Sequence, residues 1–350
     1  MIKRTETRPI RVGDLQIGGQ NKVVIQSMTN TKTADIEATL QQIDDLNDHG
    51  CQIVRLAIFD MQDADAVKTI KENSALPLVA DIHFDYRLAL RALENGIDKI
   101  RINPGNITAQ DKIKLIVAAC KQRRVPIRIG INGGSLAADL LKKYEHPCAA
   151  AMIESARQNI AILENLDFHD ICLSFKASDP RLCTEAYLLA AETFDYPLHL
   201  GVTEAGSFFT SSVRSSAALG ILLNAGIGDT LRISVSGDPV SELRIAKELL
   251  NCFGLMPDYP QLIACPTCGR LQYDMLAIVP QVEEHLEKIK KPLKVAIMGC
   301  AVNGPGEARE ADIGIAGGNQ EALLFKKGEI IRKIKQDDIL KEFLAEIDSL

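Results

Sequence analysis

Residues 23–58 read VVIQSMTNTKTADIEATLQQIDDLNDHGCQIVRLAI, and this stretch carries the pattern that decides the fold. It opens with a β-branched run, VVIQSM (23–28), and closes with a second one, IVRLAI (53–58). Between them lies DIEATLQQIDDLNDHG (35–50), an amphipathic segment with a glycine where a helix stops. The stretch therefore predicts a strand, a helix and a second strand, the unit from which parallel sheets are built.

The same alternation of β-branched runs and helical segments continues to about residue 250. Eight such strands predict a parallel sheet, and eight is the number that closes a TIM (β/α)8 barrel. An open doubly wound sheet is the alternative architecture. The wider gap between the fifth and sixth runs indicates an extra helix. The other six runs are LVADI (78–82), KIRIN (99–103), PIRIGIN (126–132), DICLSFK (170–176), LHLGVT (198–203) and TLRISVS (230–236).

The repeating pattern breaks after CFGLMPDYP (252–260). We therefore expect a barrel domain over 1–255, a small α/β domain over 256–350 and a hinge near 252–262. The elements predicted beyond the break are a helix over 275–290, a strand over 293–298, a turn at NGPGE (303–307), a hairpin near 313–334 and a final helix over 337–347.

The composition is that of a soluble globular enzyme with an aliphatic core. The chain has 350 residues, of which 46 % are apolar and 25 % charged, and it has no Trp. A net charge of −6 gives no electrostatic reason to expect a nucleic acid as partner. The sequence shows neither a secretory signal nor an uncharged run long enough to span a membrane. Nine scattered cysteines, an odd number, argue for a reducing compartment, so we expect a cytoplasmic protein.

Five of the predicted strands carry a cationic side chain within them or toward their carboxyl ends, where the chemistry of a TIM barrel takes place. An Arg inside an apolar strand needs a partner, because burying an unpaired charge is costly. Internal salt bridges with Asp81 and Glu204 are one interpretation, but two carboxylates cannot neutralise five cations. The other interpretation is a polyanionic ligand, most simply a diphosphate, held by Arg forks and a Lys. The five cations are Arg55, Arg101, Arg128, Lys176 and Arg232.

Further polar residues stand at the same strand ends. Three pairs have a spacing that places both side chains on one face of a strand, namely Arg101 with Asn103, Arg128 with Asn132, and Arg232 with Ser234. Asn103 and Asn132 would orient neutral oxygens of the ligand.

Two more strand-end residues are candidates for catalysis. His83 is either a packed or surface histidine or, beside Asp81, a functional one. Glu204, in GVTEAG, is either a general acid with a tuned pKa or a partner for an Arg.

Three cysteines fall in the predicted second domain, in CPTCGR (265–270) and MGCAVNGPGE (298–307). Cys265 and Cys268 have the spacing that lets two thiolates reach one metal centre, and Cys300 follows. Structural zinc, an iron–sulfur cluster and a redox dithiol all use such a motif. Zinc would need a fourth N or S ligand, and this segment offers only His285, within a predicted helix. The other six cysteines are expected to be packing residues.

An oxygen ligand is the remaining choice for the fourth position. Glu307 follows Cys300 after a Gly-Pro-Gly turn that can fold the chain back. A carboxylate is a weakly held ligand for iron, and a substrate oxygen could displace it. Three thiolates and one exchangeable position are what a catalytic iron–sulfur cluster requires.

The motifs CPTCGR, MGCAVNGPGEA, RINPGN, ADIHF, SFKASD, GVTEAG and RISVSGDP resemble those of one enzyme family. These are the bacterial 4-hydroxy-3-methylbut-2-enyl diphosphate synthases of the non-mevalonate isoprenoid pathway. The resemblance runs from QSMT (26–29) to the end of the second domain, without a departure at an important position.

The resemblance implies a reaction and a cofactor. Members of this family are oxidoreductases that reductively open 2-C-methyl-D-erythritol 2,4-cyclodiphosphate and remove its C3 hydroxyl as water. Their one 4Fe–4S cluster per chain would be held here by Cys265, Cys268, Cys300 and Glu307. The electrons arrive singly from reduced flavodoxin or ferredoxin. A homodimer is expected, because in this family the cluster domain of one subunit closes over the barrel of the other.

The resemblance also assigns roles to the strand-end residues. Glu204 would protonate the departing hydroxyl, and Glu307 would be a labile ligand first and a proton source once displaced. Asp81 and His83, with Asn103 and Asn132, would orient the carbon skeleton. The diphosphate would be held by Arg55, Arg101, Arg128, Lys176, Arg232 and Ser234.

Three other classes compete with this interpretation. A zinc-dependent barrel hydrolase would work without a reductant. A pterin-binding barrel transferase would also use an anion at a barrel mouth, but it leaves the three cysteines unexplained. A non-enzymatic iron–sulfur sensor would not need the five cations.

Overall fold

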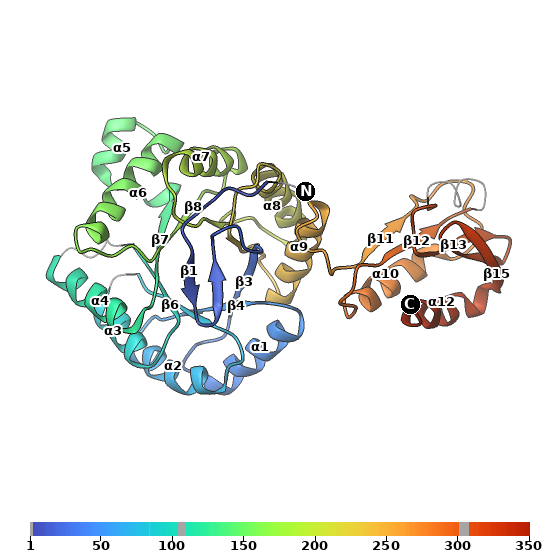
Figure 1. Cartoon of the computed structure of the whole chain (residues 1–350), viewed down its shortest axis with the longest axis horizontal. Helices are drawn as coiled ribbons and strands as arrows, with labels where there is room; N and C mark the ends of the chain where they lie inside the picture. Colours follow the sequence, from blue (N-terminus) through green and yellow to red (C-terminus); the bar gives the residue numbers. More distant parts are fainter. Residues whose placement is uncertain (1–2, 84, 104–109, 301–307) are drawn as a thin grey trace. The chain divides into compact units, whose positions relative to one another are not determined.

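The computed structural model describes residues 3–83, 85–103, 110–300 and 308–350 (Figure 1). Two compact units make up the chain, Met1–Leu255 and Met256–Leu350. Within the described ranges, no helix combines the length and apolar character that crossing a membrane requires.

A parallel sheet of eight strands, counted over the described residues, forms the core of the first unit. Its strands follow the order β8-β7-β6-β5-β4-β3-β10-β9, and a parallel bridge between Leu173 and Leu198 joins the two ends of that order. The sheet therefore closes, so the predicted TIM barrel is confirmed and the open-sheet alternative is wrong. The strands are β3 (Val24–Met28), β4 (Ile53–Ala57), β5 (Leu78–Asp81), β6 (Lys99–Ile102), β7 (Ile127–Asn132), β8 (Ile171–Lys176), β9 (His199–Leu200) and β10 (Thr230–Leu231).

Helices surround these strands (Figure 1). Five of them begin at an Asp whose carboxylate accepts a hydrogen bond from a backbone N–H of the first turn, which satisfies a donor that has no partner within the helix. The wide gap after β7 holds α5 and α6, so the extra helix is confirmed. The helices are α1 (Ile36–Asp48), α2 (Met61–Asn73), α3 (Tyr86–Glu94), α4 (Gln110–Arg123), α5 (Ala138–Tyr144), α6 (Ala149–Glu164), α7 (Pro180–Thr193), α8 (Phe208–Asn224) and α9 (Pro239–Cys252).

The last two barrel strands are shorter than the sequence predicts. β9 ends at Leu200 and β10 at Leu231, so the predictions of strand to 203 and 236 are wrong. Arg232 and Ser234 consequently lie beyond β10 and not on it. Single backbone hydrogen bonds continue past both strand ends, from Arg232 N to Leu200 O at 3.0 Å and from Thr203 N to Ala177 O at 3.2 Å.

A short antiparallel hairpin covers the amino-terminal end of the barrel (Figure 1). It consists of β1 (Ile10–Val12) and β2 (Leu15–Ile17), which the sequence pattern did not predict. Ile10, Val12 and Ile17 pack in one buried cluster with Val24 and Val79 of the barrel strands. This apolar floor leaves the opposite, carboxyl end of the barrel as the polar one.

The second unit is built on a sheet with the order β11-β12-β13-β14-β15, as far as the described residues extend. β11, β12 and β13 are parallel, and β14 pairs antiparallel with both β13 and β15. The predicted helices, strand and hairpin are confirmed with shifted ends, whereas the turn 303–307 lies outside the described residues. The elements are β11 (Gln261–Ala264), α10 (Met275–Leu286), β12 (Lys294–Met298), β13 (Ile313–Gly318), β14 (Glu321–Lys326), β15 (Glu329–Lys335) and α12 (Ile339–Asp348).

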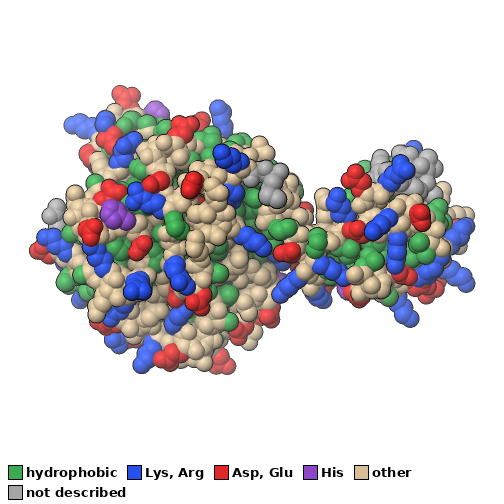
Figure 2. Space-filling model, viewed as in Figure 1, with side chains coloured by type: hydrophobic (Ala, Val, Ile, Leu, Met, Phe, Trp, Pro, Cys, Tyr) green, Lys and Arg blue, Asp and Glu red, His purple; other side chains and the backbone are tan. Residues whose placement is uncertain are grey.

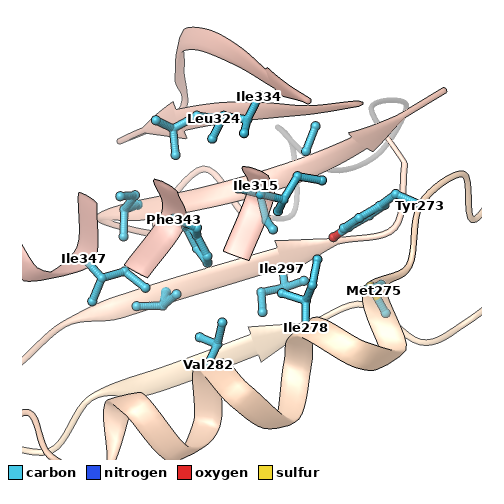
Figure 3. Packing of buried hydrophobic residues seen from close by; sticks show 14 of the residues in the cluster. Tyr273, Met275, Ile278, Val282, Ile297, Ile315, Leu324, Ile334, Phe343 and Ile347 are labelled. Carbon is cyan, nitrogen blue, oxygen red and sulfur yellow. The ribbon is translucent and has the colours of Figure 1, made fainter. Parts of the chain in front are cut away.

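Helices α10 and α12 pack on one face of the sheet (Figure 3). Ile297 and Ile315 point from the strands toward Val282 of α10 and Phe343 of α12. Alternate residues on the other face, Met298 among them, form a separate cluster against which Cys265 packs. The side-chain period of two therefore separates the helix-covered core from the face that carries the cysteine loop.

Candidate active site

The five cations predicted at the strand ends act on one another electrostatically inside the barrel, although Arg128 is the second residue of β7, beside Arg101 of β6, and not at its carboxyl end. We call them the cation cluster. Arg55, Arg101, Arg128 and Lys176 are each at most 8 % exposed. The surface differs, because Figure 2 shows Lys and Arg interspersed with Asp and Glu on the face that it draws. The cluster members are Arg55 in β4, Arg101 in β6, Arg128 in β7, Lys176 in β8 and Arg232 after β10.

Asp81 is the carboxylate that links two members of the cluster. Its Oδ2 lies 3.6 Å from Arg55 Nε, and its Oδ1 lies 3.2 Å from Arg101 Nη1. Burial by itself opposes ionisation of this carboxyl. The charges of Arg55, Arg101 and Arg128 outweigh burial and lower the pKa of Asp81 to about 2. Asp81 is therefore ionised throughout the physiological range.

Glu242 is a second carboxylate beside the cation cluster, and the sequence analysis missed it. Arg232 Nε and Nη2 donate to its two oxygens at 3.0 and 2.7 Å. Glu242 lies in the first turn of α9 and is 2 % exposed. In the sequence, Glu242 stands three residues after Pro239 at an Asp-Pro helix start, where it resembles an ordinary first-turn acid.

The cluster retains more positive charge than its carboxylates neutralise. Burial and the neighbouring cations lower the pKa of Lys176 well below its ordinary range. Burial likewise lowers the pKa of Arg55 to about 9 and that of Arg128 to about 10. Among the described residues, Asp81 and Glu242 are the two carboxylates paired with these five cations. Such an arrangement is unfavourable by itself and is relieved by an anionic ligand.

Two glycines make room for the cationic side chains. A Cβ on Gly130 would stand 2.7 Å from Arg101 Nε, and a Cβ on Gly201 would stand 3.2 Å from Lys176 Nζ. Gly130 lies two residues after Arg128, and Gly201 lies two residues after His199. By the alternation of an extended chain, each glycine therefore faces the same side as that earlier residue. Any larger residue at Gly130 would displace the Arg101 guanidinium.

The remaining predicted polar residues stand around this cluster. Asn132 ends β7 opposite Lys176 of β8, and Asn103 directly follows β6; both are half-buried. Ser234 is half-buried, and its carbonyl accepts from Ser211 Oγ at 2.8 Å. His83 is exposed, so the interpretation as a packed core histidine is wrong; its Nε2 lies 3.2 Å from Arg101 Nη1.

Glu204 lies in the loop after β9 with its side chain exposed. Its backbone has a φ of 53°, a left-handed conformation that is uncommon for Glu. Its carbonyl accepts from Arg214 Nη1 at 3.4 Å. Arg232 forms its salt bridge with Glu242 and not with Glu204. The Glu204 carboxylate is exposed at the surface of this loop.

The three cysteines of the second unit occupy loops at one end of its sheet. Cys265 follows β11 and Cys300 follows β12, and these two strands are parallel neighbours. Cys268 is exposed, and hydrogen bonds from Arg270 lower its pKa. The thiolate charges of all three cysteines act on the Arg270 guanidinium, so the three sulfurs share one neighbourhood. Of the other six cysteines, Cys252 is exposed, so the prediction that all six pack inside is wrong for it.

The three thiols are ligands of the type that binds an iron–sulfur cluster, but the predicted set of four ligands includes one residue that is not described. Glu307, the predicted fourth ligand, lies outside the described residues. Within them, no three His, Cys, Asp or Glu side chains are grouped to bind a metal ion. The three thiols lie near the Arg270 guanidinium, and one of them, Cys268, is exposed and has a lowered pKa. Such thiols are nevertheless the ligands that an iron–sulfur cluster binds.

Family models match both units of the chain. The GcpE TIM-barrel domain matches residues 7–247, and the GcpE protein C-terminal domain matches residues 261–349.

Curated proteins match over the full length. A protein of Geobacillus thermodenitrificans is 57 % identical over 350 residues, which covers 100 % of this chain and 94 % of that protein. A protein of Halalkalibacterium halodurans is 56 % identical over 347 residues, covering 99 % and 95 %. Both are named 4-hydroxy-3-methylbut-2-en-1-yl diphosphate synthase (flavodoxin).

Solved structures share the fold at low identity. The N-acetylneuraminic acid synthetase of Leptospira borgpetersenii superposes with a TM-score of 0.51 at 12 % identity, over 81 % of this chain and 98 % of that one. This likeness concerns the fold alone.

Proposed function

The chain belongs to the GcpE family and is an enzyme that forms 4-hydroxy-3-methylbut-2-en-1-yl diphosphate from 2-C-methyl-D-erythritol 2,4-cyclodiphosphate; we propose how its own residues carry out this conversion. The barrel binds the cyclic diphosphate, and the second unit holds a 4Fe–4S cluster. The reaction takes up two electrons, opens the cyclic diphosphate and releases the C3 hydroxyl as water.

The excess positive charge at the barrel mouth is the observation that carries this proposal. Asp81 and Glu242 are already engaged with Arg55, Arg101 and Arg232. A diphosphate supplies the missing negative charge, and planar guanidinium groups match its oxygens in pairs. We assign the diphosphate to the cation cluster together with Ser234.

The residues that surround the cluster orient the carbon skeleton. The two amides Asn103 and Asn132 can donate to hydroxyl oxygens, while the Asp81 carboxylate can accept from one. His83 Nε2 lies 3.2 Å from Arg101 Nη1, so this histidine stands beside the cation cluster, where it could contact the ligand. These contacts would place the C3 hydroxyl in a single orientation.

Glu204 is the proposed proton source for the departing hydroxyl. A hydroxyl leaves as water only if it gains a proton, and a carboxylic acid within hydrogen-bond reach supplies it. Glu204 combines a left-handed backbone with an exposed side chain in the loop after β9. A strained backbone at a candidate acid is typical of functional positions.

Cys265, Cys268, Cys300 and Glu307 would hold the iron–sulfur cluster. Such a cluster, when bound, supplies single-electron transfer and one iron position that can exchange its ligand. Arg270 beside the three thiols favours their ionised forms, which metal binding requires. Glu307 would be the exchangeable ligand.

We further propose reduced flavodoxin, or ferredoxin, as the electron donor. The names of the relatives specify flavodoxin. A cytoplasmic homodimer, in which the second unit of one chain works with the barrel of its partner, completes the proposal.

The proposal is tested on protein purified without air. Iron, sulfide and product are measured, with the cyclic diphosphate as substrate and reduced flavodoxin as donor. We expect four irons per chain and product formation that stops without the donor. Cys265→Ala should lose iron, while Cys120→Ala, which removes a buried packing thiol of α4, should keep it. Stoichiometric zinc, or turnover without a reductant, would refute the assignment.

A further inference from the structure

Met28, the half-buried last residue of β3, lies between two arginines of the cation cluster. Arg55 Nε and Nη2 donate to its Sδ at 3.0 and 2.9 Å. Arg232 Nη1 contacts the same sulfur at 3.8 Å. β3 pairs with β4 on one side and with β10 on the other, and Met28 is the register partner of Arg55. One thioether therefore contacts a guanidinium from the segment on either side of it.

The two guanidinium groups are fixed along the same edge but by different acceptors. Arg232 donates through Nε and Nη2 to the two oxygens of Glu242, at 3.0 and 2.7 Å. Arg55 presents the same edge, Nε with Nη2, to the sulfur of Met28. A guanidinium has five N–H donors in a rigid plane, so the edge formed by Nη1 and Nη2 can still pair with an anion. Met28 thus does for Arg55 what Glu242 does for Arg232.

The sulfur holds Arg55 without neutralising its charge. A thioether is a weak and uncharged acceptor. The Oδ2 of Asp81 lies 3.6 Å from Arg55 Nε, farther than the sulfur, and the same carboxylate also pairs with Arg101. A carboxylate at position 28 would pair with Arg55 and compete with an anionic ligand, whereas a hydrocarbon would accept no hydrogen bond. An uncharged acceptor fixes the guanidinium and keeps its charge for the ligand.

We propose that Met28 is a positioning residue for the diphosphate: its thioether fixes the Arg55 guanidinium, with a second contact to Arg232, and leaves both charges to the ligand. This inference rests on the proposed placement of the diphosphate at the cation cluster. A methionine that only fills space is replaced best by leucine, which has a similar volume. The positioning role predicts the opposite order, because glutamine has an uncharged acceptor oxygen and leucine has none.

Three variants separate the two roles, in full-chain protein, by the binding of inorganic pyrophosphate and by steady-state kinetics. Met28→Leu should keep the melting temperature and raise both KM and the pyrophosphate Kd about three- to tenfold, with kcat nearly unchanged. Met28→Gln should stay closer to wild type in both constants. Met28→Glu should melt higher than wild type, because it neutralises cations, and should bind pyrophosphate more weakly than Met28→Leu. Met61→Leu, at an exposed methionine that begins α2, is the matched control and should behave as wild type.

Two results would overturn the role of Met28. Wild-type constants in Met28→Leu, or a glutamine variant that binds more weakly than the leucine variant, would show that packing alone is needed at this position. Arg55→Met separates this failure from that of the ligand assignment. If Arg55→Met loses pyrophosphate binding and Met28→Leu does not, the role of Met28 alone is wrong. If Arg55→Met binds pyrophosphate as tightly as wild type, the diphosphate lies elsewhere and both assignments fail.

Discussion

Arg232 and Glu242 form a two-point ion pair at the carboxyl end of the barrel, with donor–acceptor distances of 3.0 and 2.7 Å. The Glu242 oxygens also accept from Ser27 Oγ at 2.8 Å and from Val235 N at 3.2 Å. The carboxylate is thereby fixed from β3, from the loop after β10 and from its own helix. Glu242 is a positioning residue that sets the direction of the Arg232 guanidinium.

Replacing Glu242 by Gln should weaken substrate binding more than the chemical step. The amide keeps the shape but loses the charge, so Arg232 is no longer held by two charge-assisted bonds. We expect KM to rise about tenfold or more with kcat changed little, which is the pattern of lost uniform binding. Glu242→Asp, which restores the charge, should recover part of the affinity. If both variants keep the wild-type KM and lower only the melting temperature, Glu242 is merely structural.

Gly130→Ala should disturb Arg101 without disturbing the fold. The new Cβ would stand 2.7 Å from Arg101 Nε, and the flexible guanidinium can give way where backbone could not. We expect a severalfold higher KM at an unchanged melting temperature. Gly134→Ala is the matched control, since nothing lies within 4 Å of the Cβ that it would add. Equal steady-state constants for the two variants would remove Arg101 from substrate binding.

Asp81 should make the stability of the barrel depend on acid pH. Its folded pKa is about 2, below the ordinary value of 3.8, so its stabilisation is complete above about pH 4 and is lost as the pH falls toward 2. Asp81→Asn should be less stable at pH 7 because Arg55 and Arg101 lose their counter-charge. Between pH 4 and 2 the variant should show a smaller loss of stability than wild type. Denaturant unfolding at several pH values measures both effects, and parallel pH curves would contradict the pairing.

Glu204→Gln should keep the metal content and lose turnover. An amide occupies the same space but cannot donate the proton that the leaving hydroxyl needs. Removing a general acid typically costs about 10²- to 10⁴-fold in rate. Glu72→Gln, at an exposed position of α2, is the control for a lost surface carboxylate. Near-normal kcat in the Glu204 variant would exclude it as the acid.

The barrel and the second unit could be read from the sequence because long periodic segments dominate both. Runs such as IVRLAI have the composition of a buried strand, and the segment after residue 35 has the period of a helix. The packing in the folded chain requires the same structure that each local pattern predicts. The cations were found by one argument, that a charge in an apolar strand needs a reason. The same argument applies to Lys99, which is fully buried in β6 and which the sequence pattern alone did not bring forward.

Other features depend on contacts that no local pattern carries. Each strand of the hairpin β1–β2 has three residues, too few for a period to be recognised. β9 and β10 are two residues long each, and the residues after them make single backbone hydrogen bonds to neighbouring segments, which no local pattern indicates. Glu242 looks like a surface acid of a helix, and only the closed barrel brings it to Arg232. The sequence could name the cations and their partner Asp81, but not Glu242, the carboxylate that pairs with Arg232.

Mössbauer spectroscopy of ⁵⁷Fe-loaded protein, prepared without air, tests the central claim most directly. The claim is that three thiolates and one exchangeable oxygen ligand hold a four-iron cluster that meets the diphosphate substrate. We predict one iron of the four with a spectrum distinct from the thiolate-bound three, and a change in that iron alone when the cyclic diphosphate is added. Protein without iron, or four equivalent irons that ignore the substrate, would contradict the account.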